Sequence, residues 1–193
     1  MERIVGKKAP NFEMTAVKGD GIDFKKISLK DYKGKWLVMF FYPLDFTFVC
    51  PTEITGFSDE IDKFKEENAE VLAVSVDSEY SHKAWIEGDL GKIKFPIASD
   101  MTKKVSEDYG VLLEDEGVAL RGLFIIDPDG IVDFYQSIEK NWSPYFIDKK
   151  IKRLEMLLKK LQSNNKYSEY KEWELEKYIP DLENLTNELI HNL

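Results

Sequence analysis

Two short apolar segments, residues 36–42 and 71–76, stand on either side of one amphipathic stretch, and this order constrains the fold of the 193-residue chain most strongly. Both segments have the length and apolar character of strands that are buried inside a sheet. The apolar residues between them recur at steps of three and four: Ile54, Phe57, Ile61 and Phe64. This spacing predicts one amphipathic helix over residues 51–68. A strand, a helix and a second strand in this order predict two parallel neighbours in a sheet that the helix covers.

The rest of the chain predicts further elements of the same α/β kind. Before the first apolar segment, Gly-Asp-Gly at residues 19–21 is typical of a hairpin turn, and residues 28–34 predict a short helix between a Ser cap and a Gly stop. The elements predicted after the second segment are a capped helix from residue 77, an edge strand at 95–100, a helix at 102–109, strands at 122–127 and 131–138, and a periodic helix at 146–161. Because Pro-Asp-Gly forms a turn between those last two strands, we expect them to make an antiparallel hairpin.

Charge and apolar runs exclude several classes of partner. The formal net charge is −9, which disfavours binding to the phosphate backbone of a nucleic acid. No segment approaches the roughly 18 apolar residues of a membrane span, and residues 1–8 lack the apolar core of a signal peptide. A single cysteine cannot form a disulfide within the chain, and a free thiol suits a reducing compartment. We therefore expect a cytoplasmic protein that binds neither nucleic acid nor membrane.

Composition also divides the chain into two parts. Residues 1–162 are expected to form one domain with its own core. Residues 163–193 contain seven acidic residues and three lysines. Leu182, Leu185 and Leu189 share one face of a possible last helix. We expect this acidic C-terminal tail to dock either on its own body or on a partner subunit.

The only cysteine of the chain, Cys50, stands where an apolar segment ends and a helix is predicted to begin. Pro51 suits the first helical position, and Glu53 suits the first turn. Unpaired N–H groups and the dipole at a helix N-terminus stabilise an anion, and the thiolate is the reactive form of a cysteine. Thr47, three residues earlier, could aim its hydroxyl at whatever the sulfur attacks. The alternative is an inert cysteine that is buried as a small apolar residue.

Two peptides of the chain resemble the signature of a known enzyme family. They are FYPLDFTFVCPTE at residues 41–53 and DEGVALRGLFIID at residues 115–127. Both resemble peroxiredoxins of the typical two-cysteine and alkyl hydroperoxide reductase branch, and the resemblance runs from about Gly6 to about Asp133. It implies a thioredoxin-like α/β fold with an N-terminal β extension, a central mixed sheet flanked by helices, and a C-terminal helical tail.

The resemblance also implies an activity and a set of site residues. The activity is reduction of hydrogen peroxide and organic hydroperoxides by the thiolate of Cys50, with no cofactor and no metal. Thr47 would orient the peroxide, and Pro43 would shield the pocket from water. Arg121 would stabilise the thiolate and the charge that develops in the transition state, and Glu53 would hold Arg121 through a bidentate pair.

The chain departs from this branch where the second cysteine is usual. Typical members carry a resolving cysteine in a Val-Cys-Pro-x-x-Trp peptide, whereas the nearest match here, residues 168–173, has Glu169 at that place. A Val-Gly-Arg peptide of the family is also absent, and residues 139–144 stand there instead. We therefore expect a one-cysteine mechanism that depends on an outside thiol, supplied by a thioredoxin-like or glutaredoxin-like protein or by glutathione.

Two other functions compete with the enzyme. The chain could be a weakly catalytic relative that acts as a peroxide sensor, a chaperone or a scaffold, which the missing C-terminal motifs favour. A dithiol oxidoreductase is disfavoured because Cys50 has no CxxC partner.

The apolar loop at residues 46–49 resembles a surface through which related dimers associate, so we expect a homodimer or a ring of dimers. We interpret His82 as a solvated or capping residue, since no cysteine, carboxylate cluster or second histidine near it in the sequence could bind a metal with it. We interpret Trp85 as part of the core or of the pocket wall.

Overall fold

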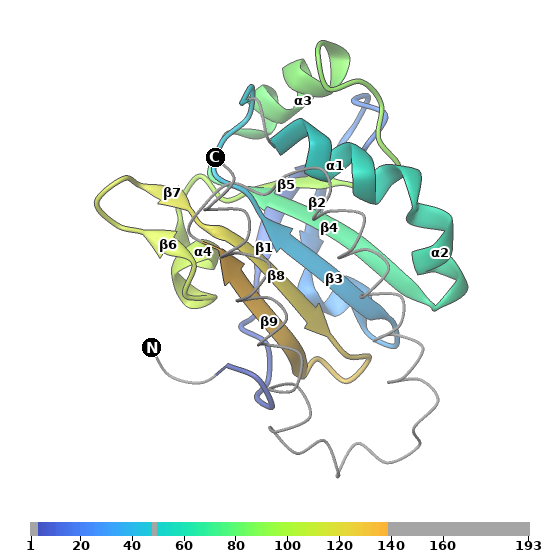
Figure 1. Cartoon of the computed structure of the whole chain (residues 1–193), viewed down its shortest axis with the longest axis vertical. Coiled ribbons are helices and arrows are strands. Elements are labelled where there is room, and N and C mark those ends of the chain that lie inside the picture. The colour runs from blue at the N-terminus through green and yellow to red at the C-terminus, as the bar shows by residue number, and fades with distance from the viewer. Residues whose placement is uncertain (1–3, 48–49, 139–193) are drawn as a thin grey trace, which may run out of the picture. The chain divides into compact units, whose positions relative to one another are not determined.

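The computed structural model describes residues 4–47 and 50–138, which belong to one compact unit, Met1–Met156. A seven-stranded sheet runs through this unit in the order β2-β1-β5-β4-β3-β8-β9 (Figure 1). Its strands are β1 (Glu13–Val17), β2 (Phe24–Ser28), β3 (Trp36–Phe41), β4 (Ala69–Ser75), β5 (Ile97–Ser99), β8 (Arg121–Ile126) and β9 (Val132–Ile138). The helices are α1 (Cys50–Asp59), α2 (Ile61–Glu66), α3 (Glu79–Glu87), α4 (Lys104–Asp108) and the short 3₁₀ helix η1 (Leu29–Tyr32).

The centre of the sheet is the strand, helix and strand unit that the sequence predicts. β3 pairs with β4 in parallel, with Val38 opposite Val71, and all six residues of β3 are buried. On its other side β3 pairs antiparallel with β8, which forms the predicted hairpin with β9. The sheet is therefore mixed and flanked by helices. This confirms the expected thioredoxin-like α/β class.

The helix predicted over residues 51–68 is two helices in the structure. Its hydrogen-bond ladder weakens at Glu60, whose N–H lies 3.4 Å from the carbonyl of Gly56. The next turn is tighter, because the N–H of Lys63 donates to the carbonyl of Glu60 at 3.0 Å, three residues back. α1 therefore ends at Asp59 and α2 begins at Ile61, although the apolar spacing continues across the break.

The strand that was expected at an edge of the sheet lies inside it. β5 pairs with β4 on one side and with β1 on the other, and its three residues are buried. The outer position is taken by the N-terminal β1–β2 hairpin, which turns through the predicted Gly19–Gly21 segment. A small second sheet of β6 (Leu112–Leu113) and β7 (Val118–Ala119) was not predicted, because two-residue strands carry no period.

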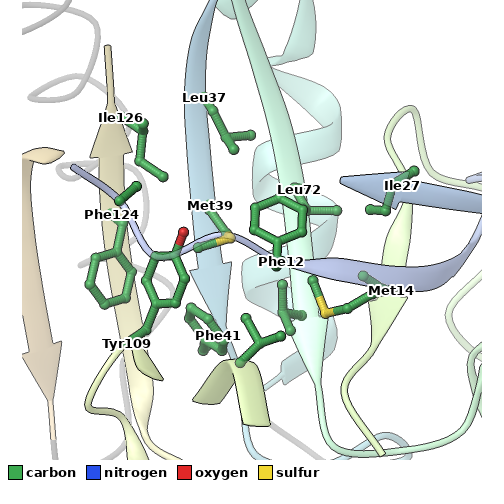
Figure 2. Packing of buried hydrophobic residues seen from close by; sticks show 14 of the residues in the cluster. Phe12, Met14, Ile27, Leu37, Met39, Phe41, Leu72, Tyr109, Phe124 and Ile126 are labelled. Carbon is green, nitrogen blue, oxygen red and sulfur yellow. The ribbon is translucent and has the colours of Figure 1, made fainter. Parts of the chain in front are cut away.

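Side chains on β3 alternate between two faces of the sheet, and each face has an aromatic core. On one face Phe40 stacks on Phe57 of α1, with ring centroids 4.6 Å apart. On the other, Phe41 meets Tyr109 and Phe124, and the last two rings pack edge to face at 5.0 Å (Figure 2). Because successive strand residues point to opposite faces, one continuous apolar segment serves both cores.

Several predictions lie outside the described residues. They concern the helix at 146–161, the tail at 163–193, and the peptides at 139–144 and 168–173. The division into a domain of residues 1–162 and a tail thus stays a prediction. Among residues 4–47 and 50–138, no helix has both the length and the apolar character to cross a membrane.

Asp133 on β9 provides a test of stability against pH. Its side chain is half-buried, and Oδ2 has no hydrogen-bond partner among the described residues. Burial raises the pKa of Asp133 to about 6, and the negative charge of Asp127 acts in the same direction. Because the folded state holds this proton more tightly than the unfolded chain does, the group destabilises the fold progressively as pH rises from about 4 to about 6.

Asp133→Asn should therefore raise the free energy of unfolding at pH 7.5 and leave it nearly unchanged at pH 4. A shift of two pKa units corresponds to about 3 kcal/mol, and partial exposure to solvent reduces our expectation to about 1–2 kcal/mol. Urea unfolding of both proteins at the two pH values measures the difference. Equal stability of both proteins at pH 7.5 would contradict the burial argument.

Candidate active site

Cys50 is the first residue of α1, as the sequence predicts, and its side chain is fully buried. β3 ends at Phe41, and the loop that follows leads to this helix start; its residues 48 and 49 lie outside the described part. The Cys50 residue therefore stands at the N-terminus of α1, the end of the helix dipole that attracts negative charge.

Arg121 reaches Cys50 from a strand that is distant in sequence. It is the first residue of β8, and because β8 runs antiparallel to β3, with Gly122 opposite Phe41, it arrives at the end of β3 where α1 begins. Its Nη2 donates to Cys50 Sγ at 3.2 Å, and its Nη1 donates to Glu53 Oε2. The guanidinium therefore bridges the sulfur and a carboxylate that lies one turn further along α1.

All three groups of this bridge are buried, with Arg121 at 7% exposure and Glu53 at 3%. A charge-assisted hydrogen bond is stronger in such surroundings than in water, and an unpaired buried charge would be costly. Glu53 thus balances the arginine and holds it in place, while the second arm of the guanidinium faces the sulfur. This arrangement can stabilise a thiolate and any negative charge that develops beside it.

Pro43 and Thr47 lie in the loop between β3 and α1, and both are half-buried. The Thr47 hydroxyl donates to the backbone carbonyl of Leu44 at 3.3 Å, a long hydrogen bond. Since the bond goes to the loop's own backbone and not to Cys50, the structure places Thr47 in the same loop but leaves its role toward a substrate as a prediction. The shielding role of Pro43 likewise stays a prediction.

The expectation that His82 is solvated is wrong. The residue is fully buried, and its Nδ1 lies 2.8 Å from Oδ2 of Asp45, in the loop before Cys50. Sequence reasoning missed Asp45 altogether. The signal that could have placed His82 inside is its spacing, because His82, Trp85 and Ile86 share one face of α3 and all three are buried. Trp85 is in the core, as expected.

Tyr42, at the start of the loop, contacts the same group of residues. Its hydroxyl donates to Oδ1 of Asp45 at 2.8 Å, and its ring lies 6.1 Å from that of Trp85. Burial raises the pKa of Tyr42 well above its ordinary value, and negative charge at Asp45 and at Cys50 acts in the same direction. The tyrosine therefore stays neutral and serves as a hydrogen-bond donor at neutral pH.

Nothing in the described residues forms a metal centre. Within residues 4–47 and 50–138 there is no group of three or more His, Cys, Asp or Glu side chains that could hold an ion. What the described site does bring together is the buried Cys50 sulfur and the Arg121 guanidinium.

Comparison with known proteins gives consistent matches. The family model described as AhpC/TSA family matches residues 5–135. A putative peroxiredoxin in the rubredoxin operon of Clostridium pasteurianum is 66% identical over 139 residues, which cover 69% of this chain and 78% of that protein. A mitochondrial thioredoxin-dependent peroxide reductase of Rattus norvegicus is 58% identical over 133 residues, which cover 66% of this chain and 51% of that protein. Among solved structures, the reduced 2-Cys peroxiredoxin of Plasmodium vivax matches with a TM-score of 0.77 and 38% identity, over 86% of each chain.

Proposed function

Because this chain belongs to the AhpC/TSA family and is a peroxiredoxin, a thiol peroxidase, we propose that Cys50 is the residue its peroxide substrate oxidises and that a one-cysteine mechanism completes the cycle. The substrates are hydrogen peroxide and organic hydroperoxides. Pro43, Thr47, Glu53 and Arg121 form the rest of the site.

One contact carries this proposal, the hydrogen bond from Arg121 Nη2 to Cys50 Sγ at 3.2 Å. A cation at this distance stabilises the thiolate before the reaction and the charge on the departing oxygen during it. Glu53 keeps the guanidinium in that position. The thiol of a merely structural cysteine has no need of a buried arginine that is itself held by a buried carboxylate.

The reaction balances without a cofactor. The Cys50 thiolate attacks one oxygen of the peroxide, the O–O bond breaks, and hydroxide or alkoxide leaves and takes up a proton. The sulfur becomes a sulfenic acid. An outside thiol then condenses with it to a mixed disulfide and releases water, and a second thiol displaces Cys50 by exchange. The relative from Rattus norvegicus is named as thioredoxin-dependent, so a thioredoxin-like dithiol protein is the reductant we propose first.

The fate of the first oxidation product tests this mechanism. The reduced protein receives one equivalent of hydrogen peroxide without reductant, followed by intact-mass and non-reducing gel analysis. We expect a monomer-sized band with one added oxygen that dimedone traps, because Cys50 is the only thiol in each chain. Cys50→Ser should gain no oxygen. A prompt, near-complete covalent dimer would overturn the one-cysteine mechanism, and a Cys50 thiol that hydrogen peroxide leaves unoxidised would overturn the peroxidase assignment.

We also propose that the chain assembles at least as a homodimer. Two aromatic side chains on neighbouring elements are exposed, Tyr80 of α3 at 67% and Phe24 of β2 at 41%, and their rings meet edge to face at 5.3 Å. Phe46 in the loop before Cys50 is 57% exposed. Exposed apolar patches of this kind mark association surfaces. The surface expected from the sequence was the loop at residues 46–49, of which Phe48 and Val49 lie outside the described residues.

Sedimentation velocity at micromolar concentration checks the assembly. We expect a species of at least twice the 22.5 kDa chain, and Tyr80→Asp should weaken any larger ring. A monomer at that concentration would rule out the proposal. We place the protein in the cytoplasm because a lone thiol suits a reducing compartment, and cell fractionation that recovers it elsewhere would contradict this location.

A further inference from the structure

A buried polar cluster lies behind the loop that leads to Cys50, and its centre is Asp45. The Asp45 side chain is 2% exposed, and that of His82 is fully buried. Oδ1 of Asp45 accepts from the Tyr42 hydroxyl at 2.8 Å. Oδ2 accepts from Ser81 Oγ at 2.7 Å and lies 2.8 Å from His82 Nδ1. Three donors from the loop and from α3 therefore converge on one carboxylate.

The backbone of Asp45 is held as firmly as its side chain. Its N–H donates to Oδ2 of Asp77 at 2.7 Å, just beyond the end of β4. Asp77 is itself fixed, because its N–H donates to Ser75 Oγ at 3.1 Å and its carbonyl accepts from Ser99 Oγ at 2.6 Å. The cluster thus ties the loop to the ends of β4 and β5 and to the first turns of α3.

The loop needs such restraint, because its backbone at the next residue is strained. Phe46 has a φ of 54°, in the left-handed region that residues other than glycine seldom adopt. Its side chain is largely exposed, and its ring lies 5.8 Å from that of Trp85. A strained conformation persists only where its surroundings over-determine it. Here the hydrogen bonds of Asp45 supply that restraint, two residues from both Pro43 and Thr47.

We propose that Asp45, oriented by His82, is a positioning residue for peroxide reduction, which sets where Thr47 and Pro43 stand relative to the Cys50 sulfur. It touches neither the sulfur nor Arg121 in the described contacts. The inference rests on the proposed function. The role of Asp45 is separate from the role that the proposed function assigns to Arg121. Arg121 stabilises the charge on sulfur, whereas Asp45 governs how well the peroxide is aligned with it.

His82 acts in this cluster through one nitrogen. Nδ1–H donates to the carboxylate, and Nε2 has no hydrogen-bond partner among the described residues. The amide nitrogen of an asparagine can occupy the place of Nδ1. His82→Asn should therefore keep the function of the donor, whereas His82→Leu should lose it.

The test compares two reagents for the same sulfur. Asp45→Asn keeps the shape of the side chain, but its amide group turns a donor toward groups that need an acceptor. The second-order rate constant for oxidation by hydrogen peroxide should fall by about 10- to 100-fold, since a small misplacement of an orienting group costs that much. The rate of alkylation by iodoacetamide should change less than about threefold, because alkylation depends on the thiolate and not on peroxide alignment.

Three comparisons separate positioning from general damage. His82→Leu should lower the peroxide rate in the same way, and His82→Asn should restore most of it. Asp45→Asn should add little in a Thr47→Val background, because two residues that act through one another are not additive. Asp59→Asn, an exposed carboxylate at the far end of α1, is the matched control and should change neither rate.

Several results would overturn the inference. They are a peroxide rate for Asp45→Asn within about threefold of the wild type, an equal fall in both rates, or full additivity with Thr47→Val. If Asp45→Asn does not fold, Ser81→Ala, which removes one donor to the same carboxylate, carries the test with a smaller expected loss of about three- to tenfold. If the wild type itself fails to react with peroxide, the proposed function fails. If the wild type reacts with peroxide and the variants react at the same rate, the positioning inference fails and the proposed function stands.

Discussion

Arg121→Met should slow the oxidation of Cys50 by hydrogen peroxide by about 100- to 1,000-fold, the usual cost of removing one donor that stabilises transition-state charge. The substitution keeps most of the side-chain length and removes both arms of the bridge, one to Cys50 Sγ and one to Glu53. Stopped-flow measurement of the second-order rate constant gives the effect directly. Alkylation of Cys50 at neutral pH should slow as well, since the arginine acts on the thiolate itself.

Two further variants show which arm matters. Arg121→Lys keeps the charge but cannot fork to both partners, so its rate should lie between those of the wild type and Arg121→Met. Glu53→Gln should have a smaller effect than Arg121→Met, because the guanidinium keeps its contact with the sulfur. Circular dichroism is needed for each variant, since removing the arginine leaves Glu53 buried without this partner. A folded Arg121→Met protein that reacts within about threefold of the wild type would contradict the role of the arginine.

Phe124→Ala should lower the free energy of unfolding by about 3–5 kcal/mol, the range for truncating a buried aromatic residue. Phe124 on β8 is fully buried and packs against three other rings. Its ring lies 5.6 Å from that of Phe41 and 5.0 Å from that of Tyr109 (Figure 2), and 4.6 Å from that of Tyr135. Its loss therefore leaves a cavity that three rigid neighbours cannot close. Urea unfolding at fixed protein concentration measures the change.

The matched control for this prediction lies at the edge of the same sheet. Ile22→Ala, in the turn just before β2, removes an apolar side chain that is 66% exposed, so its effect should be much smaller. Phe124→Leu, which keeps most of the apolar volume, should cost less than half as much as Phe124→Ala. Equal losses for Ile22→Ala and Phe124→Ala would show that the cluster around Phe124 is not the main core of the fold.

The sequence by itself determined the features that depend only on residues close together along the chain. The apolar run of β3 and β4, the turn between β8 and β9, and the start of a helix at Cys50 all follow from local spacing and from turn or cap chemistry. Those features were confirmed, because an apolar run, a helical period or a turn signal is visible within about ten consecutive residues. The same locality explains one failure. The apolar spacing continues past Glu60, so the local sequence pattern does not indicate that α1 ends there.

Other features depend on which segments meet, and only the tertiary structure decided them. Arg121 and Cys50 are 71 residues apart and touch because β8 runs antiparallel beside β3. Resemblance to a family implied their shared role, but no spacing in this chain could. Asp45 and His82 are 37 residues apart, so the helical spacing of α3 could place His82 inside but could not identify its partner. A buried polar group is stable only when its partner is in place. Strand pairing and helix packing bring that partner, and they are properties of the whole fold.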